Sequence, residues 1–287
     1  CLGREQIAYI PAEGFMTEAY LAERLKDLCL TCKTAVFDLK QIIHLLDLPT
    51  GDGAWRKRLT DCGIAAYLLN PLTGSYPAED IAKNYLDLLI PSKEDLFGKK
   101  KPQAVRTEMP EQFFRYHCYI ACTAFLAEEV LLSRLEETGM KDLFDQIEMP
   151  LVYALADMEK SGIAADREAL LAYGEQLAER IAKLEQEIYA KAGEVFNINS
   201  PKQLGVILFE KLQLPNGKKT KTGYSTAADV LDKLAPDYPV VADILEYRQL
   251  AKLKSTYADS LAEDIAADGR IHSTFHQTIT ATGRISS

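Results

Sequence analysis

The strongest structural pattern in this sequence lies between Arg167 and Ala192. Apolar residues recur there at helical spacing along one face, and charged residues fill the other face. The apolar face is formed by Leu170, Leu177, Ile181, Leu184 and Ile188. Gly193 follows at a position where glycine often ends a helix. The pattern predicts one long amphipathic helix, and with it a mainly helical second half of the chain.

Further local signals follow this helix. Ser200 precedes Pro201, which suits a first helical position, and Gln203 stands three residues after the Ser cap, so a helix is predicted to start here. The remaining predicted elements are a basic, Gly-containing loop at 215–226, a helix over 240–262, a turn at 268–269 and a strand over 270–275.

The first 147 residues have a mixed character. Short β-type runs alternate with helical stretches, which predicts an α/β domain, and Thr17 is placed to cap the first helix. The predicted strands are Ile7–Ile10 and Thr34–Phe37, and the predicted helices are Thr17–Leu30, Ile42–Leu48, Ile64–Leu69 and Tyr116–Leu135. The stretch from Ser92 to Glu108 is rich in Lys, Pro and Gly and is predicted to be a surface loop.

Composition places the chain among ordinary globular proteins. It has 287 residues, of which 47% are hydrophobic and 26% charged, and this length suits about two domains. No run approaches the roughly 20 apolar residues of a membrane span, and the first residues lack a secretion signal, so a cytoplasmic location is expected. The net charge of −9 argues against broad nucleic-acid coating but leaves room for a local basic stripe.

The cysteines show no disulfide framework. Cys29 and Cys32 have the C-x-x-C spacing of redox and zinc sites, but no second Cys or His pair stands at a finger-like distance. Reduced, buried thiols are the expectation, with a zinc site as the weaker alternative. The full set is Cys1, Cys29, Cys32, Cys62, Cys118 and Cys122.

Two groups of basic residues lie in the second half. Lys218, Lys219 and Lys221 stand in the loop among hydroxyl-bearing residues, a mixture of charge and donors that suits phosphate oxygens. Arg248 and Lys252 are four residues apart, so a helix places both on one face, and Lys254 follows. On spacing alone, solvated surface charge remains the alternative.

The last eleven residues, 277–287, combine three threonines, Gly283 and Arg284 after the predicted final strand. The glycine would let the backbone turn, and the arginine supplies a planar fork of donors. These features suit close approach to a ligand, although an ordinary polar loop has the same composition.

Several strings together resemble the bacterial type I family of DNA polymerases, family A, in that family's order and spacing. They are Phe196–Leu212, Lys218–Thr226, Leu245–Tyr257 and Thr280–Ser287, with Ile147–Val152 and Met158–Ile163 resembling the family's join between its nuclease-like and polymerase domains. The resemblance is dense from about residue 147 onward and thinner before it. It implies a degenerate 3′–5′ exonuclease-like domain of the ribonuclease H-like α/β class over 1–147, with its first strand missing. It further implies a helical connection and thumb over 148–265 and the truncated start of an α+β palm over 266–287.

The resemblance implies that the thumb holds primer–template DNA and that the palm entry reaches the minor-groove edge of the primer end, where every correct pair presents acceptors. Arg284 is the residue similar to the family's minor-groove arginine. The DNA-binding positions implied are Asn197, Asn199, Ser200, Lys202, Lys218, Lys219, Lys221, Thr222, Arg248, Lys252, Lys254, Gln277, Thr280 and Arg284.

The resemblance also implies what the chain lacks. Phosphoryl transfer needs metal ions held by clustered carboxylates, and in this family these come from motifs downstream of Ser287, as does the nucleotide-binding helix. The intact polymerase would therefore use Mg²⁺ and deoxynucleoside triphosphates through its remainder. This chain alone is expected not to polymerise, and a monomer is expected.

The exonuclease motifs depart from the family pattern where metal binding would occur. Ile42 and Ile120 occupy two positions at which the family has carboxylates, and isoleucine cannot bind a hard cation. No exonuclease activity is expected. Asp38 is read as a strand-end or cap group. Asp157 and Glu159 diverge on a helix and are read as surface residues.

Three functions stay open at this point. The first is part of a DNA-directed DNA polymerase of replication or repair. The second is a standalone DNA-binding or scaffold protein that retains only the thumb, which the end of the sequence in mid-motif disfavours. The third is an active exonuclease, which Ile42 and Ile120 disfavour.

Overall fold

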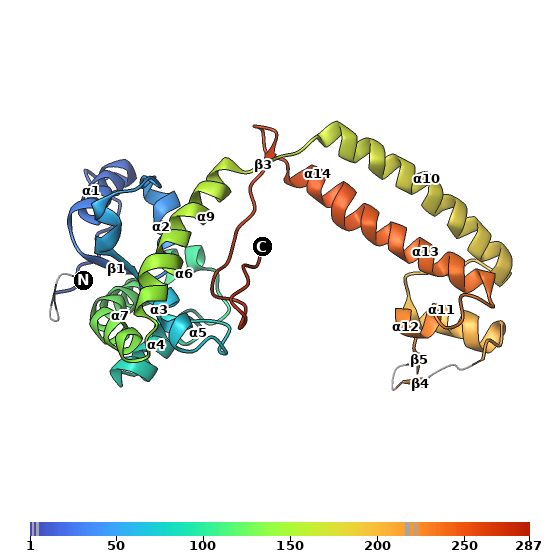
Figure 1. Ribbon diagram of the computed structural model, residues 1–287, viewed down its shortest axis with the longest axis horizontal. Coiled ribbons are helices and arrows are strands. Elements are labelled where there is room, and N and C mark those ends of the chain that lie inside the picture. Colours follow the sequence, from blue (N-terminus) through green and yellow to red (C-terminus); the bar gives the residue numbers. More distant parts are fainter. Residues whose placement is uncertain (2, 4–5, 216–218, 221–222) are drawn as a thin grey trace. The chain divides into compact units, whose positions relative to one another are not determined.

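The computed structural model describes residues 1, 3, 6–215, 219–220 and 223–287. The chain divides into two compact units, of which unit 1 comprises Cys1–Gly162 with Ser273–Ser287 and unit 2 comprises Ile163–His272. Figure 1 shows that helices make up most of each unit. Within the described ranges, no helix combines the length and the apolar character that crossing a membrane requires.

Unit 1 consists of a small sheet among helices. In chain order its elements are α1 (Glu18–Thr31), β1 (Thr34–Val36), α2 (Leu39–Leu46), the 3₁₀ helix η1 (Ala54–Arg58), β2 (Leu59–Asp61), α3 (Cys62–Leu69), α4 (Ala78–Leu86), α5 (Lys93–Phe97), α6 (Pro102–Glu108), α7 (Pro110–Glu137), α8 (Lys141–Leu143), the π-helix η2 (Phe144–Glu148) and α9 (Met149–Ser161).

Strands β1 and β2 pair in parallel, with Thr34 opposite Leu59 and Val36 opposite Asp61. All three residues of β2 are buried. Asp61 ends this strand and caps α3, because its carboxylate accepts hydrogen bonds from Gly63 N (2.8 Å) and Ile64 N (3.1 Å). It also accepts one from Leu39 N at 2.6 Å. Burial raises the pKa of Asp61 to about 6 against the opposing effect of these N–H donors. One buried carboxylate thus joins β2 to the starts of α2 and α3.

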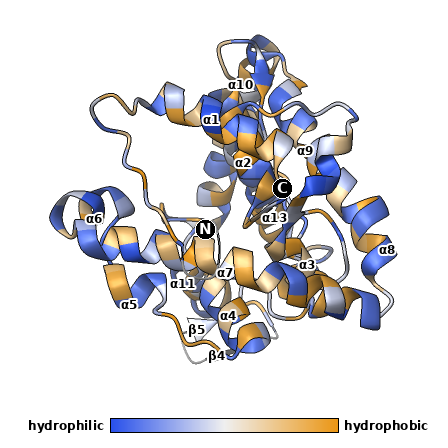
Figure 2. Ribbon diagram, turned by 90° about the vertical axis from the view of Figure 1, so that its left-hand side faces the viewer, coloured by the Kyte–Doolittle hydropathy of each residue, from blue (hydrophilic) through white to orange (hydrophobic). Residues whose placement is uncertain are grey.

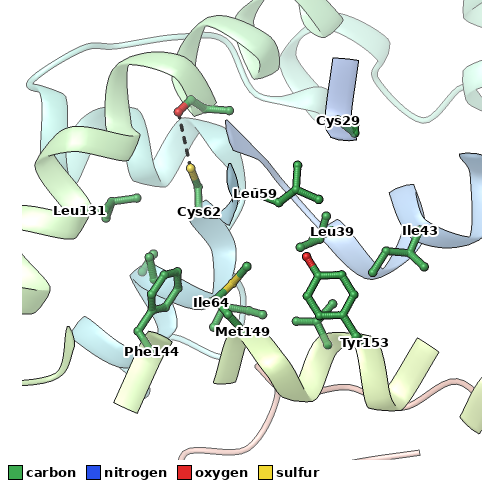
Figure 3. Packing of buried hydrophobic residues seen from close by; sticks show 14 of the residues in the cluster. Cys29, Leu39, Ile43, Leu59, Cys62, Ile64, Leu131, Phe144, Met149 and Tyr153 are labelled. Carbon is green, nitrogen blue, oxygen red and sulfur yellow. Dashed lines mark hydrogen bonds between the residues drawn. The ribbon is translucent and has the colours of Figure 1, made fainter. Parts of the chain in front are cut away.

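The core of unit 1 forms where α2, α7 and α9 pack around β2 (Figure 3). Helix α7 carries hydrophobic and hydrophilic residues along its length (Figure 2), and it buries Ala124, Ala127, Leu131 and Leu135 at spacings of three and four residues. Figure 3 shows the side chains that meet these from α2, β2, α3 and the η2–α9 segment, among them Leu39, Ile43, Leu59, Cys62, Phe144, Met149 and Tyr153.

Unit 2 is built on two long helices. Its elements are β3 (Ile163–Ala164), α10 (Arg167–Ala192), α11 (Pro201–Val206), the π-helix η3 (Ile207–Lys211), β4 (Lys219–Thr220), β5 (Gly223–Tyr224), α12 (Ala228–Leu231), α13 (Pro239–Leu253), the π-helix η4 (Lys254–Asp259), α14 (Ser260–Asp264) and β6 (Arg270–Ile271). Strand β3 pairs with β6, and β4 with β5, both antiparallel.

Helices α10 and α13 pack along each other in unit 2, and α11 with η3 covers their lower ends in Figure 1. Leu184 and Ile188 of α10 are fully buried against Val241 and Ile244 of α13. Arg180 donates two hydrogen bonds to Glu246, each 2.8 Å long, and so joins the two helices outside that apolar contact. The packed cluster supplies a rigid support for the loops at this end of the unit.

Most of the predicted helices are confirmed. Helix α10 has the predicted bounds, and Gly193 ends it with a φ of 76°. Thr17 caps α1 by accepting a hydrogen bond from Tyr20 N, and Asp38 caps α2 by accepting one from Gln41 N. The predicted strand Thr34–Phe37 is present as β1.

Three predictions of local structure are wrong. Residues Ile7–Ile10 form no strand, and both isoleucines are more than 40% exposed, while Tyr9 between them packs its ring against Phe114 of α7 rather than pairing with another strand. The predicted loop from Ser92 to Glu108 contains α5 and α6, because Ser92 and Asp95 form a reciprocal cap and Pro102 occupies a first helical position. The final strand is limited to Arg270–Ile271, the only two of its residues that pair with β3.

The compact units differ from the predicted domains 1–147, 148–265 and 266–287. Residues 144–161 form consecutive helical turns in η2 and α9 that pack within unit 1, and residues 273–287 also belong to unit 1. The predicted domains follow the resemblance to the family, whereas the units follow contacts within the structure. The predicted domains therefore remain a prediction. Among the described residues of unit 1 the strands form a single parallel pair, so the α/β content there is small.

Candidate nucleic-acid interface

The turn before α11 is held by side chains that the sequence predicts to bind DNA. Ser200 caps the helix by accepting a hydrogen bond from Gln203 N (3.4 Å), as predicted. Gln203 does not return the bond to Ser200, because its Oε1 accepts from Asn197 N at 2.8 Å. Asn197 Oδ1 accepts from Asn199 N, and Asn199 Nδ2 donates to the Tyr247 hydroxyl. This turn is therefore fixed by its own polar groups.

A shallow groove lies between this turn and the segment that follows β5. It is lined by Asn199, Pro201, Tyr224, Ser225, Thr226, Ala227 and Arg248. Arg248 fixes one wall, because its guanidinium donates to Thr226 O (2.6 Å) and to Thr226 Oγ1 (3.2 Å). Thr226 is buried, and burial lowers the pKa of Arg248 from its ordinary value. Arg248 thus holds the loop in addition to lining the groove.

A glycine lets the two walls approach. A Cβ at Gly205 in α11 would lie 3.0 Å from Tyr224 Cβ and 3.4 Å from the Tyr224 carbonyl oxygen, closer than most packed side chains tolerate. Neither this contact nor the Arg248–Thr226 pair was found from the sequence. The sequence placed Thr226 in the basic loop and Arg248 on a helix, but nothing in their spacing indicates that they meet.

The predicted lysines fall into three groups. Lys202 on α11 and Lys252 on α13 are exposed. Lys254 is engaged by Asp259, with Nζ–oxygen distances of 2.7 and 2.8 Å. Lys218, Lys221 and Thr222 lie outside the described residues, and Lys219 is described only as part of β4, opposite Tyr224.

The predicted palm-entry residues are held against unit 1. Gln277 Nε2 donates to Glu148 O (3.1 Å) and Glu148 Oε2 (3.0 Å). Thr280 Oγ1 donates to Arg284 O at 2.6 Å, which closes a turn in which Gly283 has a φ of 75°. The side chain of Arg284 is exposed. Among these three predicted residues, Arg284 is thus the one that projects into solvent.

Unit 1 also contains a cavity of about 460 Å³ beside the 274–278 segment. Glu159 lines it and is 9% exposed. Its carboxylate accepts hydrogen bonds from Lys40 Nζ, His44 Nε2 (2.6 Å) and Phe275 N (2.6 Å). The prediction that Glu159 is a surface residue is wrong, because Lys40, His44 and the 274–278 segment cover it. The predicted divergence from Asp157 is confirmed, since Asp157 accepts from Thr50 Oγ1 on the exposed side.

The two residues predicted to mark a degenerate exonuclease site lie on different helices, α2 and α7. Ile42 is half-buried and packs against the core of unit 1, and Ile120 is half-buried in α7. In the described ranges, no three His, Cys, Asp or Glu side chains are grouped so that they could hold a metal ion. Cys29 and Cys62 are buried, whereas Cys32 is exposed, so the expectation of buried thiols holds for only part of the set.

Comparisons with known proteins all find DNA polymerases. Residues 167–287 match the family model described as DNA polymerase family A. DNA polymerase I of Bacillus subtilis is 43% identical over 230 residues, which is 79% of this chain and 26% of that protein. DNA polymerase I of Streptococcus pneumoniae strain R6 is 42% identical over 264 residues, 91% of this chain and 30% of that protein. The chain thus spans less than a third of these curated relatives.

A solved structure is similar over nearly the whole chain. It is the POL domain of Pol1 from M. smegmatis in complex with DNA primer-template and dNTP, with a TM-score of 0.72 and 31% sequence identity. The similarity covers 96% of this chain and 44% of that one.

Proposed function

Because this chain belongs to family A of the DNA polymerases, we propose that it is part of a DNA-directed DNA polymerase and that its unit 2 binds primer–template DNA. The observation that carries the proposal is the groove in unit 2, whose walls are fixed before any ligand arrives. A wall that is already ordered loses little conformational entropy when it binds.

The groove offers the chemistry that a phosphate backbone requires. Asn199, Ser225 and Arg248 line it, and the exposed lysines at 202 and 252 stand respectively next to Pro201 and one helical turn from Arg248. Contacts of this kind fix the position of a duplex and carry no sequence information. That property suits a general polymerase, which must hold any template.

The predicted residues take different roles in this proposal. Lys202 and Lys252 contact phosphates, as do the loop residues Lys218, Lys219, Lys221 and Thr222. Asn197 and Ser200 shape the turn before α11, and Asn199 lines the groove. Arg248 uses two donor atoms on Thr226 and keeps further N–H groups for a phosphate. Lys254 would have to leave Asp259 to reach DNA, so we assign it a smaller contribution.

We propose that residues 266–287 form the start of the palm and that Arg284 contacts the minor-groove edge of the primer end. The exposure of Arg284 on a turn closed by Thr280 supports this role. Minor-groove acceptors are shared by all correct pairs, so a fixed donor there senses pair geometry without reading sequence. Gln277 and Thr280 act by holding the turn rather than by free side-chain contact with DNA.

We propose that residues 1–147 descend from a ribonuclease H-like 3′–5′ exonuclease and no longer proofread. Ile42 and Ile120 at the family's carboxylate positions support this proposal. We assign the Mg²⁺ ions of polymerisation and the deoxynucleoside triphosphates to the remainder of the polymerase, as the resemblance to the family implies. We expect the intact enzyme to act in the cytoplasm as a monomer.

Arg284 provides the experiment, in the intact polymerase. A charge-assisted hydrogen bond contributes about 1.5–3 kcal/mol, so Arg284→Ala should slow single-turnover incorporation roughly ten- to a hundredfold. The dissociation constant for primer–template DNA should change much less. Arg284→Lys should not restore the rate, because a point charge does not reproduce the guanidinium fork. Normal incorporation with weakened DNA binding would make Arg284 a backbone anchor and contradict the proposed role.

A further inference from the structure

The segment 275–280 is attached to unit 1 by both its backbone and its side chains. Phe275 is held on both peptide groups, since its N–H donates to Glu159 and its carbonyl accepts from Lys40 Nζ. Gln277 donates to Glu148, and the Thr280 carbonyl accepts from the Tyr67 hydroxyl at 2.9 Å. Residues from α2, α3, η2 and α9 thus bind the segment 275–280, which ends four residues before Arg284.

Glu159 is the centre of this attachment. It bonds both to the 275–280 segment, through Phe275 N, and to α2, through Lys40 and His44. Burial disfavours its charged form, but the bonds from Lys40, Phe275 and His44 outweigh burial and hold the pKa of Glu159 below its ordinary value. The carboxylate is therefore charged at neutral pH, and it can accept hydrogen bonds from all three donors.

We propose that Glu159 is a positioning residue for Arg284. In this proposal the first 162 residues hold the segment 275–280 in place, although the positions at which the family binds its nuclease metals are degenerate. The inference rests on the proposed function of Arg284. Removing Glu159 leaves the Lys40 ammonium, 14% exposed, without its carboxylate and the Phe275 N–H without its acceptor. Both losses free Phe275 at the start of the segment, so the turn at 280–284 is no longer held at a fixed position.

Hydrogen exchange in this chain tests the attachment without any assay of DNA synthesis. Glu159→Ala should speed amide exchange in peptides from 273–280 about ten- to a hundredfold, the scale of losing hydrogen bonds to a charged group. Glu159→Gln should stay much closer to wild type than Glu159→Ala, because its amide oxygen still accepts from Phe275 N. Asp157→Ala, two residues away on the exposed side of α9, is the matched control and should change nothing in these peptides. Unchanged exchange in Glu159→Ala would overturn the inference.

The same variants in the intact polymerase test the consequence. Glu159→Ala should lower single-turnover incorporation at least about tenfold through misplacement of the segment, while the dissociation constant for primer–template DNA stays within about twofold. Glu159→Gln should recover most of the rate, and Asp157→Ala should equal wild type. A Glu159→Ala enzyme with normal incorporation would overturn the positioning role. If wild type itself neither binds nor extends primer–template DNA, the proposed function fails, whereas the exchange result would still report on the attachment.

Discussion

Arg248 uses its guanidinium to hold Thr226, a residue of the groove wall. It spans from α13 to Thr226 and is half-buried, so its removal should release the wall of the groove as well as a charge. We therefore expect Arg248→Ala to raise amide exchange in peptides from 223–227 and to weaken duplex binding about tenfold, since each hydrogen bond to a charged group contributes roughly 1.5–3 kcal/mol. Lysine should not substitute, because it cannot donate from a planar fork.

Arg180→Ala is the control for that measurement. It breaks a similar double hydrogen bond, which joins Arg180 of α10 to Glu246 of α13, but Arg180 does not line the groove. Equal losses of DNA affinity in the two variants would show that Arg248 acts only through the general stability of unit 2.

Asp61 makes a pH-dependent contribution to stability. Its pKa is raised to about 6 from 3.8, so the native state holds this proton more tightly than the unfolded chain. The stabilisation is complete below about pH 4 and is lost as pH rises through about 6, with a total of at most about 3 kcal/mol. Asp61→Ser keeps a side-chain oxygen to cap α3 but removes the titrating group. Urea denaturation from about pH 4 to about pH 7 should show wild type losing stability relative to the variant, and a constant difference would contradict this account.

Residue contacts within one turn could be predicted from the sequence, and those between distant segments could not. Thr17, Asp38 and Ser200 cap helices as expected, because a cap depends on residues within three positions. Glu159 was misjudged because its three partners lie on α2 and near the C-terminal end of the sequence. The helix angle between it and Asp157 indicates only that they diverge, not which of them is buried.

At the scale of elements, periodicity predicted the long helices and failed on short ones. The five apolar positions of α10 specify it independently of its neighbours. Composition alone suggested a loop at 92–108, whereas the cap formed by Ser92 and Asp95 starts α5. At Ile7–Ile10 the β-type residues occur without a neighbouring strand among the described residues, and propensity without pairing does not make a strand.

Helices α2 and α7 carry the two positions that we propose to be degenerate, and they give a prediction of their own. Ile42 in α2 and Ile120 in α7 supply no oxygen ligand, so the purified chain should not shorten a mispaired, labelled primer in Mg²⁺ or Mn²⁺. A proofreading polymerase on the same primer provides the positive control. Stepwise shortening that persists through further purification would show that other carboxylates bind the metals and that the assignment of Ile42 and Ile120 is wrong.

At the scale of the whole molecule, the family could be predicted from the sequence and the packing could not. The strings at 196–212, 218–226, 245–257 and 280–287 led to the same family as the comparisons. The assignment of α9 and residues 273–287 to unit 1 depends on long-range contacts, including Gln277 to Glu148 and Tyr67 to Thr280, which no local pattern encodes. These contacts pack a segment late in the sequence into a unit formed mostly by its first 162 residues.

We propose that unit 2 holds duplex DNA through phosphate contacts, and the salt dependence of binding checks this proposal. Fluorescence anisotropy should give dissociation constants of this chain for two unrelated primer–template duplexes over a series of salt concentrations. Lys202→Ala/Lys252→Ala should lower the log–log salt slope by about 1.8 for both duplexes, about 0.9 for each lost phosphate contact. The control Lys57→Ala/Lys83→Ala removes two exposed lysines of unit 1 and should leave the slope unchanged. No affinity for either duplex, or an unchanged slope in the unit 2 variant, would contradict the account.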